Sequence, residues 1–455
     1  MKDAVSRNPR DIVRLLTEIV GKDNVLYEQY DLIPYSRDRC PFLTHPKHGV
    51  TPLAVVRPTT TEEVREIVVL ANKHHIPLTP RGSGTNYAGS AVPSKGGVVV
   101  DLTRMNRILA IDEESMSAKV QPGLILQDFE EALSKRGFTF GHDPGSFPSA
   151  TVGGCISTWS VGWRAGKYGD MGRLVLSLKV VLPTGIVIET RSVPKSSTGF
   201  DVKSLFIGAE GAMGMITEAV LRIHPSPEKR VILVYGFKDF EQAFKSLLKV
   251  LRAGLCPMMQ LVTNKEGMEG LVEKSRANGF VMISYEGVKE VVDAQAKRTA
   301  SILEAEGGMK ISDEVAEQYW ADRHDMFSKM NLVGAAGSID TAVPVSKVLE
   351  FYKFLEDWAK RRGVKIFDIA SWVLPENLGM DSAFDESEVK AYIAARDEAL
   401  RKALELGGTT SYCVGVGTRF PHLMREEHGP ALDVLRAIKR TLDPNNIMNP
   451  GWLSP

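Results

Sequence analysis

The first segment that can do chemistry is a glycine-rich loop, Pro80-Arg81-Gly82-Ser83-Gly84-Thr85-Asn86. Glycine leaves backbone N–H groups accessible, and several such groups in one loop can surround an anion without a helix N-terminus. A Rossmann-type dinucleotide loop would need a third glycine at position 87 and a helix directly after it. Tyr87 stands there, and residues 88–93 lead to the apolar run 98–101. The pattern therefore predicts a strand, an anion-binding loop and a second strand.

Three more segments with closely spaced small residues follow this loop. They are Asp143-Pro144-Gly145-Ser146, residues 150–158 and residues 207–217. Small residues let the backbone approach a flat, extended ligand closely, and hydroxyl groups such as those of Ser157 and Thr158 can bond to it. One such segment is also typical of an ordinary turn, whereas four in this order favour one extended ligand.

The order of these motifs resembles the vanillyl-alcohol-oxidase-type (PCMH-type) family of FAD-binding oxidoreductases. The motifs are Pro-Arg-Gly-x-Gly-Thr at 80–85, Asp-Pro-Gly-Ser at 143–146, Ala-Thr-Val-Gly-Gly at 150–154, Tyr-Gly at 168–169 and Glu-Gly-x-x-Gly-x-Ile-Thr at 210–217. Residues 442–451 are similar to the C-terminal segment of the flavin-linked oxidases in that family. Within the family, the chain is most similar to the D-lactate/glycolate dehydrogenase and alkyl-dihydroxyacetonephosphate synthase branches.

The resemblance implies that these segments bind FAD. Residues 80–86 would hold the pyrophosphate, and 143–162 with 210–217 would line the adenosine and isoalloxazine portions. Relatives that attach FAD covalently through the first loop carry a histidine where Thr85 stands, so we expect non-covalent FAD; attachment through a histidine of the second domain is the alternative. The implied cofactor-binding residues are Pro80, Arg81, Gly82, Ser83, Gly84, Thr85, Asn86, Pro144, Gly145, Ser146, Thr151, Gly153, Gly154, Ser157, Thr158, Gly162, Glu210, Gly211, Gly214, Ile216 and Asn449.

The metal-binding motifs of the hydroxyacid dehydrogenase branch are not found at the matching positions. That branch carries His-x-Gly-Asp-Gly-Asn-Leu-His and Gly-Glu-His-Gly-Ile-Gly, whose histidines and glutamate hold a divalent metal. Here Ser371 and Leu378 align with the first two histidines, and Cys413 and Val414 with the Glu-His pair. We therefore expect no metal site. The synthase branch has a run of histidines before its Gly-Val-Gly, where Tyr412-Cys413-Val414 stands instead.

Three side chains remain as catalytic candidates, namely Tyr412, Arg323 and Arg419. Arg323 matches the Trp-x-x-Arg segment of the family, and a guanidinium can bind a substrate carboxylate through two parallel hydrogen bonds. A surface ion pair with Asp322 or Asp325 is the alternative for Arg323. Tyr412 can relay a proton if a cation such as Arg419 or Arg323 lowers its pKa, and packing on the flavin edge is the alternative.

Periodicity and turn residues predict the elements that position these groups. A Thr-x-x-Glu capping box at 60–63 predicts the start of a helix, and Pro225-Ser226-Pro227 predicts a domain boundary. Helices are expected at 10–20, 61–74, 125–136, 239–252 and 289–306, strands at 53–56, 76–79, 98–101, 174–182, 186–190, 231–235 and 281–285, and a hairpin at 107–120.

The resulting expectation is an α+β fold with two domains. A PCMH-type FAD-binding domain of two subdomains spans 1–226, with its core at about 48–226. An α+β, ferredoxin-like substrate or cap domain spans 227–440. The segment 441–455 returns to the FAD-binding domain.

Composition excludes several classes of protein. Lys+Arg and Asp+Glu both number 56, which argues against non-specific nucleic-acid binding. None of the 4 cysteines forms a CxxC pair, which argues against zinc-ribbon and iron–sulfur sites. No run of about 18 apolar residues occurs, so we expect no transmembrane segment and a cytoplasmic protein.

The expected function is an FAD-dependent oxidoreductase, either a dehydrogenase or an oxidase. It would take a hydride from a small alcohol or 2-hydroxy acid without a metal. One alternative is an alkyl-dihydroxyacetonephosphate-synthase-like flavoenzyme with no net redox change, and another is a non-catalytic flavin subunit of a larger complex. The expected partner is a small-molecule substrate. An electron-acceptor protein, a quinone, oxygen and a homodimer are left open.

Overall fold

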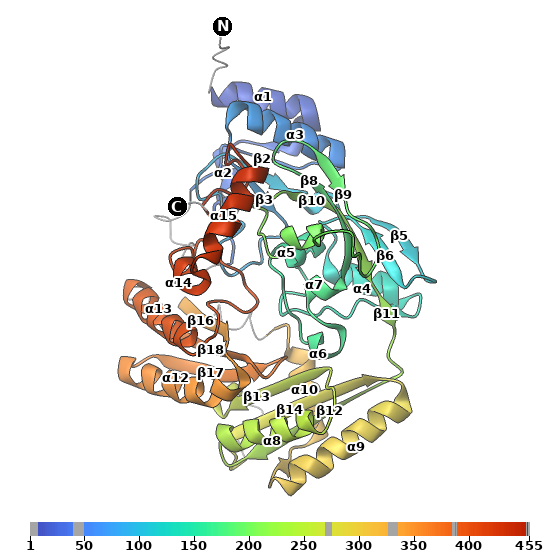
Figure 1. Cartoon of the computed structure of the whole chain (residues 1–455), viewed down its shortest axis with the longest axis vertical. Coiled ribbons are helices and arrows are strands. Elements are labelled where there is room, and N and C mark those ends of the chain that lie inside the picture. The colour runs from blue at the N-terminus through green and yellow to red at the C-terminus, as the bar shows by residue number, and fades with distance from the viewer. Residues whose placement is uncertain are drawn as a thin grey trace.

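The computed structural model describes residues 8–39, 50–268, 275–325, 335–384, 387, 389–451 and 453. In these ranges the chain forms a first domain, residues 8–225, and a cap domain that begins at β12 (Figure 1). Among the described helices, none combines the length and the apolar character that a membrane crossing requires. Cysteine 40 lies outside the described residues.

The first sheet of the first domain carries the glycine loop at the end of a strand. Its order is β1 (Val25–Leu26), β2 (Ala54–Val56), β4 (Val98–Asp101) and β3 (Leu78–Arg81), with β2, β4 and β3 parallel. Helices α1 (Pro9–Val20) and α3 (Thr61–His74) pack on one face, and α2 (Gln29–Leu32) packs on the other. The predicted capping box is confirmed, because the Thr60 hydroxyl accepts from the Glu63 N–H at 3.1 Å.

The second sheet of the first domain is antiparallel. Its order is β5 (Ile108–Asp112), β6 (Ser117–Val120), β10 (Met215–Arg222), β8 (Val175–Val181) and β9 (Val187–Glu189). The predicted hairpin is confirmed as β5–β6, and the strands predicted at 174–182 and 186–190 are β8 and β9, which pair with each other. Val181 and Met215 pack into the core of the first sheet, so the two sheets are joined through their cores. The short elements of this domain are α4 (Leu126–Ser134), β7 (Phe138–Thr139), α5 (Val152–Ser157), α6 (Ala165–Tyr168), α7 (Met171–Leu174) and β11 (His224–Pro225).

The cap domain is built on one antiparallel sheet. Its order is β15 (Met309–Lys310), β12 (Lys229–Phe237), β14 (Gly279–Gly287), β13 (Met259–Asn264), β17 (Lys365–Trp372), β18 (Asn377–Phe384) and β16 (Ala335–Ala342). Helices α8 (Phe240–Arg252), α9 (Lys289–Ala305), α12 (Val348–Arg362) and α13 (Val389–Glu405) pack on one face, while α10 (Asp313–Asp322) and Trp163 of the first domain pack on the other. Most of the cap domain is therefore an antiparallel sheet with helices on one face, in agreement with the expected α+β fold.

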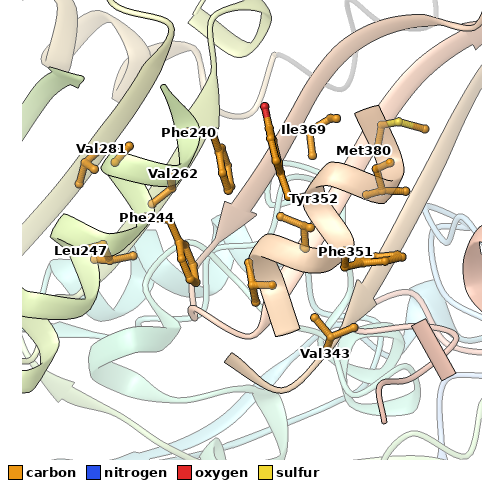
Figure 2. Packing of buried hydrophobic residues seen from close by; sticks show 14 of the residues in the cluster. Phe240, Phe244, Leu247, Val262, Val281, Val343, Phe351, Tyr352, Ile369 and Met380 are labelled. Atoms are coloured by element: carbon orange, nitrogen blue, oxygen red, sulfur yellow. The ribbon is translucent and has the colours of Figure 1, made fainter. Parts of the chain in front are cut away.

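Alternation along the cap strands produces these two faces. In β12, Leu233 and Tyr235 point to the four helices, and Ile232 and Val234 point to the first domain. Figure 2 shows the helix-side core, where residues of α8 and α12 meet above the sheet. The rings of Phe240 and Tyr352 stack there with centroids 3.9 Å apart.

The chain returns to the first domain earlier than predicted. Met424 of α14 (Met424–His428) and Leu432 of α15 (Ala431–Leu442) belong to the core of the second sheet, so both helices pack on the first domain (Figure 1). Glu426 of α14 also pairs with Arg401 of α13 in the cap at 2.8 Å. Residues 447–449 then extend the edge of β3, because Leu78 donates to the Ile447 carbonyl and Asn449 to the Leu78 carbonyl, both at 2.7 Å. The apolar side of α15 needs a core to cover it, and the first domain supplies that core.

Candidate functional site between the two domains

One cavity is lined by both domains. The first domain contributes residues from 80–87, 144–146, 150–161 and 210–216. The cap sheet contributes residues from 338–340, 368–372 and 379–381. The segment between α13 and α14, called the returning segment below, contributes residues from 413–420. Segments separated by more than 300 residues in sequence thus meet around one space. Such a position between domains is typical of ligand sites.

The glycine loop provides unpaired hydrogen-bond donors to this cavity. Within the described residues, the backbone N–H groups of residues 82–85 have no protein acceptor. Gly84 adopts a positive φ of +73°, and a Cβ on Gly82 would lie 2.2 Å from Thr151 Oγ1. Residues 82–85 are partly exposed and line the cavity, and several free N–H groups in one loop fit an anionic ligand such as the phosphates of the expected FAD.

Most of the other predicted cofactor residues line the same cavity. They are Pro80, Arg81, Asn86, Pro144, Gly145, Ser146, Thr151, Gly153, Gly154, Ser157, Thr158, Glu210, Gly211, Gly214 and Ile216. The Thr151 hydroxyl caps α5 by accepting from the Gly154 N–H at 3.3 Å, which fixes the small residues of this helix against the loop. Gly211 has a φ of +75°, and a Cβ there would lie 2.7 Å from Pro80.

Three residues predicted to bind the cofactor make contacts that hold the protein together, and two of them, Gly162 and Asn449, lie outside the lining of the cavity. Gly162 lies outside the lining of the cavity and packs on Asp143, where a Cβ would be 2.6 Å from the Asp143 backbone nitrogen. The Asn449 side chain donates to the carbonyls of Ser90 and Glu210, at 3.0 and 2.7 Å. The Glu210 carboxylate lines the cavity but accepts from the N–H groups of Val416 and Gly417, at 2.5 and 2.8 Å.

Arg323 does not reach the cavity. Its Nε donates to Asp143 Oδ2 at 2.8 Å, and its guanidinium lies 4.0 Å from the centroid of the Trp320 ring. His324 contacts the other carboxylate oxygen of Asp143 at 2.5 Å. Burial alone would raise the pKa of Asp143, but the hydrogen bond from His324 and the charge of Arg323 hold it below its usual value. The segment that matches the Trp-x-x-Arg motif therefore ties the cap to the first domain.

Tyr412 and Arg419 are placed differently from each other. Tyr412 lies outside the lining of the cavity and packs with Val161 and Trp372; burial raises its pKa, whereas a proton relay needs it lowered. Arg419 lines the cavity and is 6% exposed. Its guanidinium donates to the carbonyls of Tyr87 and Ser338, at 3.2 and 3.1 Å. Of the three predicted catalytic residues, the structure places Arg419 alone at the cavity.

The two positions aligned with metal-binding histidines, Ser371 and Leu378, do not face the cavity. Ser371 is 1% exposed and points away from the cavity, and Leu378 belongs to the helix-side core of the cap. Their strand neighbours Trp372 and Gly379 line the cavity instead, because successive side chains of a strand point to opposite faces. No described cluster joins three or more His, Cys, Asp or Glu side chains in an arrangement that could hold a metal.

The cap wall of the cavity carries acidic residues that we did not single out from the sequence. Asp340, Asp368 and Asp381 come from the three neighbouring strands β16, β17 and β18. Asp340 Oδ2 accepts from the N–H and the thiol of Cys413, at 2.9 and 3.2 Å. Asp368, Ala370 and Trp372 recur at every second position of β17, and this alternation was the signal in the sequence that could have identified the wall.

Two domain families match the chain. A model of an FAD binding domain matches residues 52–191, and a model of the C-terminal domain of FAD linked oxidases matches residues 226–453. Glycolate oxidase subunit GlcD of Bacillus subtilis is 30% identical over 460 residues, covering 97% of this chain and 96% of that protein. D-lactate dehydrogenase of Anaerostipes hadrus is 31% identical and covers 88% and 89%. Alkyldihydroxyacetonephosphate synthase of Trypanosoma brucei brucei is 25% identical and covers 100% and 83%.

Solved structures share the fold. A substrate-bound crystal structure of p-cresol methylhydroxylase has a TM-score of 0.85 at 22% identity, covering 99% of this chain and 98% of the other. An alkyldihydroxyacetonephosphate synthase has a TM-score of 0.82 at 24% identity, covering 99% and 87%. With the domain matches and the unpaired donors of the glycine loop, these findings show that the chain binds FAD and belongs to the PCMH-type family of FAD-linked oxidoreductases.

Proposed function

We propose that this protein is an FAD-dependent dehydrogenase or oxidase that acts on the CH–OH group of a small alcohol or 2-hydroxy acid without a metal. The observation that carries this proposal is the single cavity that joins the glycine loop to the polar wall of the cap. Two of the relatives are named as a glycolate oxidase subunit and a D-lactate dehydrogenase, which supports a CH–OH donor.

Different residues of the chain would bind the cofactor and cover the substrate. Bound FAD would supply a two-electron acceptor for the substrate. The N–H groups of residues 82–85 would bind its phosphates, and the small residues around Gly153 would let it approach the backbone. Trp372 and Met380 of the cap wall would cover the substrate and exclude water from the reacting carbon.

A test of this proposal is the absorbance of the FAD-loaded protein, mixed anaerobically with a panel of alcohols, 2-hydroxy acids, phenols and alkyl phosphates. Oxidation of a CH–OH donor should bleach the flavin band, and the band should return when oxygen, a quinone or an acceptor protein is added. Recovery without any acceptor would indicate synthase-like chemistry with no net redox change. A spectrum that no compound alters would indicate a non-catalytic flavin subunit.

Non-covalent attachment is the second part of the proposal. Thr85 has no nucleophilic ring nitrogen that could form the bond made by histidine at that position in covalently linked relatives. Acid precipitation of the purified protein should therefore release all of the flavin into the supernatant, where its absorbance is compared with the total. Flavin fluorescence that stays with the denatured chain on a gel would contradict this expectation.

A further inference from the structure

Asp368 and Asp381 form a pair of neighbouring carboxyl groups in the cap wall. They are direct partners on the antiparallel strands β17 and β18, and both line the cavity. Directly opposed side chains in an antiparallel pair have Cβ atoms about 5 Å apart and point to the same face. The Asp381 N–H donates to Asp368 Oδ1 at 3.2 Å, which fixes the first carboxyl against the second strand.

This pair has few donors to stabilise two negative charges. Ser338 of β16 is opposite Asp381 and bonds to its carboxyl group. The other Asp381 oxygen, Oδ1, is buried and has no hydrogen-bond partner in the described part of the chain. Asp340 differs, since Asn377 and Cys413 both donate to its carboxylate. Asp381 thus lines the ligand cavity and carries a buried carboxyl oxygen without a partner.

Two adjacent buried carboxyl groups cannot both ionise at low cost, so one of the two is favoured to keep its proton. Burial raises the pKa of Asp368 to about 6, and burial followed by the charge of Asp368 raises the pKa of Asp381. The titratable and charged groups that surround the pair are Asp340 of β16, Tyr319 of α10, Tyr392 of α13, and Cys413 and Arg419 of the returning segment.

We propose that Asp368 and Asp381 are the acid–base pair of the cavity and that they bind and deprotonate the hydroxyl group of an uncharged alcohol. The protonated carboxyl donates to the substrate oxygen, and the carboxylate accepts its proton as the O–H bond breaks. The C–H bond breaks with both of its electrons, which oxidised FAD takes up as a hydride, and a carbonyl group forms. The substrate loses two electrons and the cofactor gains two. This inference rests on the proposed function.

The charges of the wall favour an uncharged substrate over a hydroxy acid. Three aspartates line this wall, and a substrate carboxylate beside them would be repelled. Arg419 is the basic side chain of the returning segment here, and it donates to two backbone carbonyls. Arg81 belongs to the glycine loop, on the phosphate side of the cavity, and Arg39 lies beside that loop with its guanidinium 5.9 Å from the centroid of the Tyr87 ring.

The retained proton can be tested without substrate or cofactor. Infrared spectra of the apoprotein, recorded across a pH series, should show the C=O band of a protonated carboxyl group persisting at neutral pH. Asp381→Asn and Asp368→Asn should each remove this band. Asp357→Asn, at an exposed position of α12 in the same domain, should leave it unchanged. A band that survives both cavity substitutions, or is absent from the wild type, would refute the inference that Asp368 and Asp381 keep a proton at neutral pH.

The catalytic role is tested by anaerobic single-turnover bleaching of the FAD-loaded protein. Among primary and secondary alcohols, glycolate and D-lactate, an uncharged alcohol should bleach the flavin of the wild type fastest. Each cavity substitution should slow that rate by about 100-fold or more, since general acid–base catalysis contributes about 10²–10⁴-fold. Wild-type rates in both variants, or faster bleaching by the hydroxy acids, would refute the inference while leaving the proposed function intact. A wild type that no compound bleaches would refute the proposed function, whichever infrared result is found.

Discussion

At the scale of single residues, some side chains of this site form hydrogen bonds with backbone groups and so fix the segments that line the cavity. The Glu210 carboxylate accepts from Val416 and Gly417, and the Asn449 amide donates to the Glu210 carbonyl. This chain of contacts connects the returning segment to the loop before β10. A residue of a family motif can therefore be needed because it holds other parts of the site in place, as Glu210 and Asn449 do, and not only because it contacts the cofactor.

Gly84 offers a test of the phosphate loop. Its φ is +73°, and an added Cβ would lie 2.2 Å from Arg81 Nη2, beside the unpaired N–H groups. Gly137 has a similar φ of +78° with no atom within 4 Å of an added Cβ, so it is a matched control. Alanine at either position should cost about 1–2 kcal/mol of backbone strain. Gly84→Ala should in addition weaken FAD binding about tenfold or more, because the Arg81 guanidinium, which lines the cavity, must move to admit the methyl group.

The measurement is an FAD titration of each apoprotein, followed by quenching of flavin fluorescence, together with urea unfolding to compare stabilities. Equal FAD affinity in the Gly84→Ala and Gly137→Ala variants would show that residues 82–85 do not bind the cofactor. A loss of affinity restricted to Gly84→Ala, at similar stability of the two variants, is the result that the unpaired donors lead us to expect.

At the scale of elements, local patterns predicted α1, α3, α4, α8 and α9 but no helix or strand between residues 307 and 440, and they did not give the face of every strand. The capping box at Thr60 and the hairpin β5–β6 depend on residues close in sequence, so they could be predicted. The orientation of Ser371 could not be read from a gapped match to a distant motif, because a shift of one residue reverses the face of a strand. Its neighbour Trp372 lines the cavity instead.

Long-range partners also escaped prediction for a physical reason. Arg323 pairs with Asp143, a residue 180 positions earlier in the chain. Its sequence neighbours give no sign of this partner. The acidic wall likewise depends on the register of β17 with β18, which brings Asp368 opposite Asp381. The tertiary structure determines which strands pair and in which register, and this information cannot be read directly from a single sequence.

Helix α15 carries a buried lysine that joins three segments. Lys439 Nζ donates to the carbonyls of Ala212 and Met448, each at 2.8 Å, and to the Asp443 carboxylate. Lys439→Met should destabilise the protein by about 3 kcal/mol or more, since it leaves the Asp443 charge buried beside unpaired carbonyls. Arg440→Met changes an exposed neighbour in the same helix and should cost within about 0.5 kcal/mol. Urea unfolding followed by circular dichroism measures both, and equal midpoints would contradict the prediction.

At the scale of the whole molecule, ion pairs in the described part of the chain join the cap to residues 8–225 at two places. Arg164 of the first domain bonds to Glu286 of the cap at 2.6 Å, and the Tyr168 hydroxyl donates to the same carboxylate at 2.5 Å. The second place is Asp143, which receives Arg323 and His324 from the end of α10. Asp143 directly precedes Pro144 of the cavity wall, so this contact connects the position of the cap with the shape of the site.

The Asp143 contact should make the attachment of the cap depend on acid pH. The pKa of Asp143 lies below its ordinary value of 3.8, so its ionised form contributes stability that is complete above about pH 5 and is lost as the pH falls through the folded-state pKa. Asp143→Asn should be less stable than the wild type by about 3 kcal/mol near pH 7, because it leaves Arg323 without its carboxylate. The difference should shrink steadily below about pH 4. Urea midpoints across this pH range measure it, with Asp128→Asn at an exposed position of α4 as the control. A difference that stays constant from neutral to acid pH would show that the Asp143 carboxylate does not contribute to holding the two domains together.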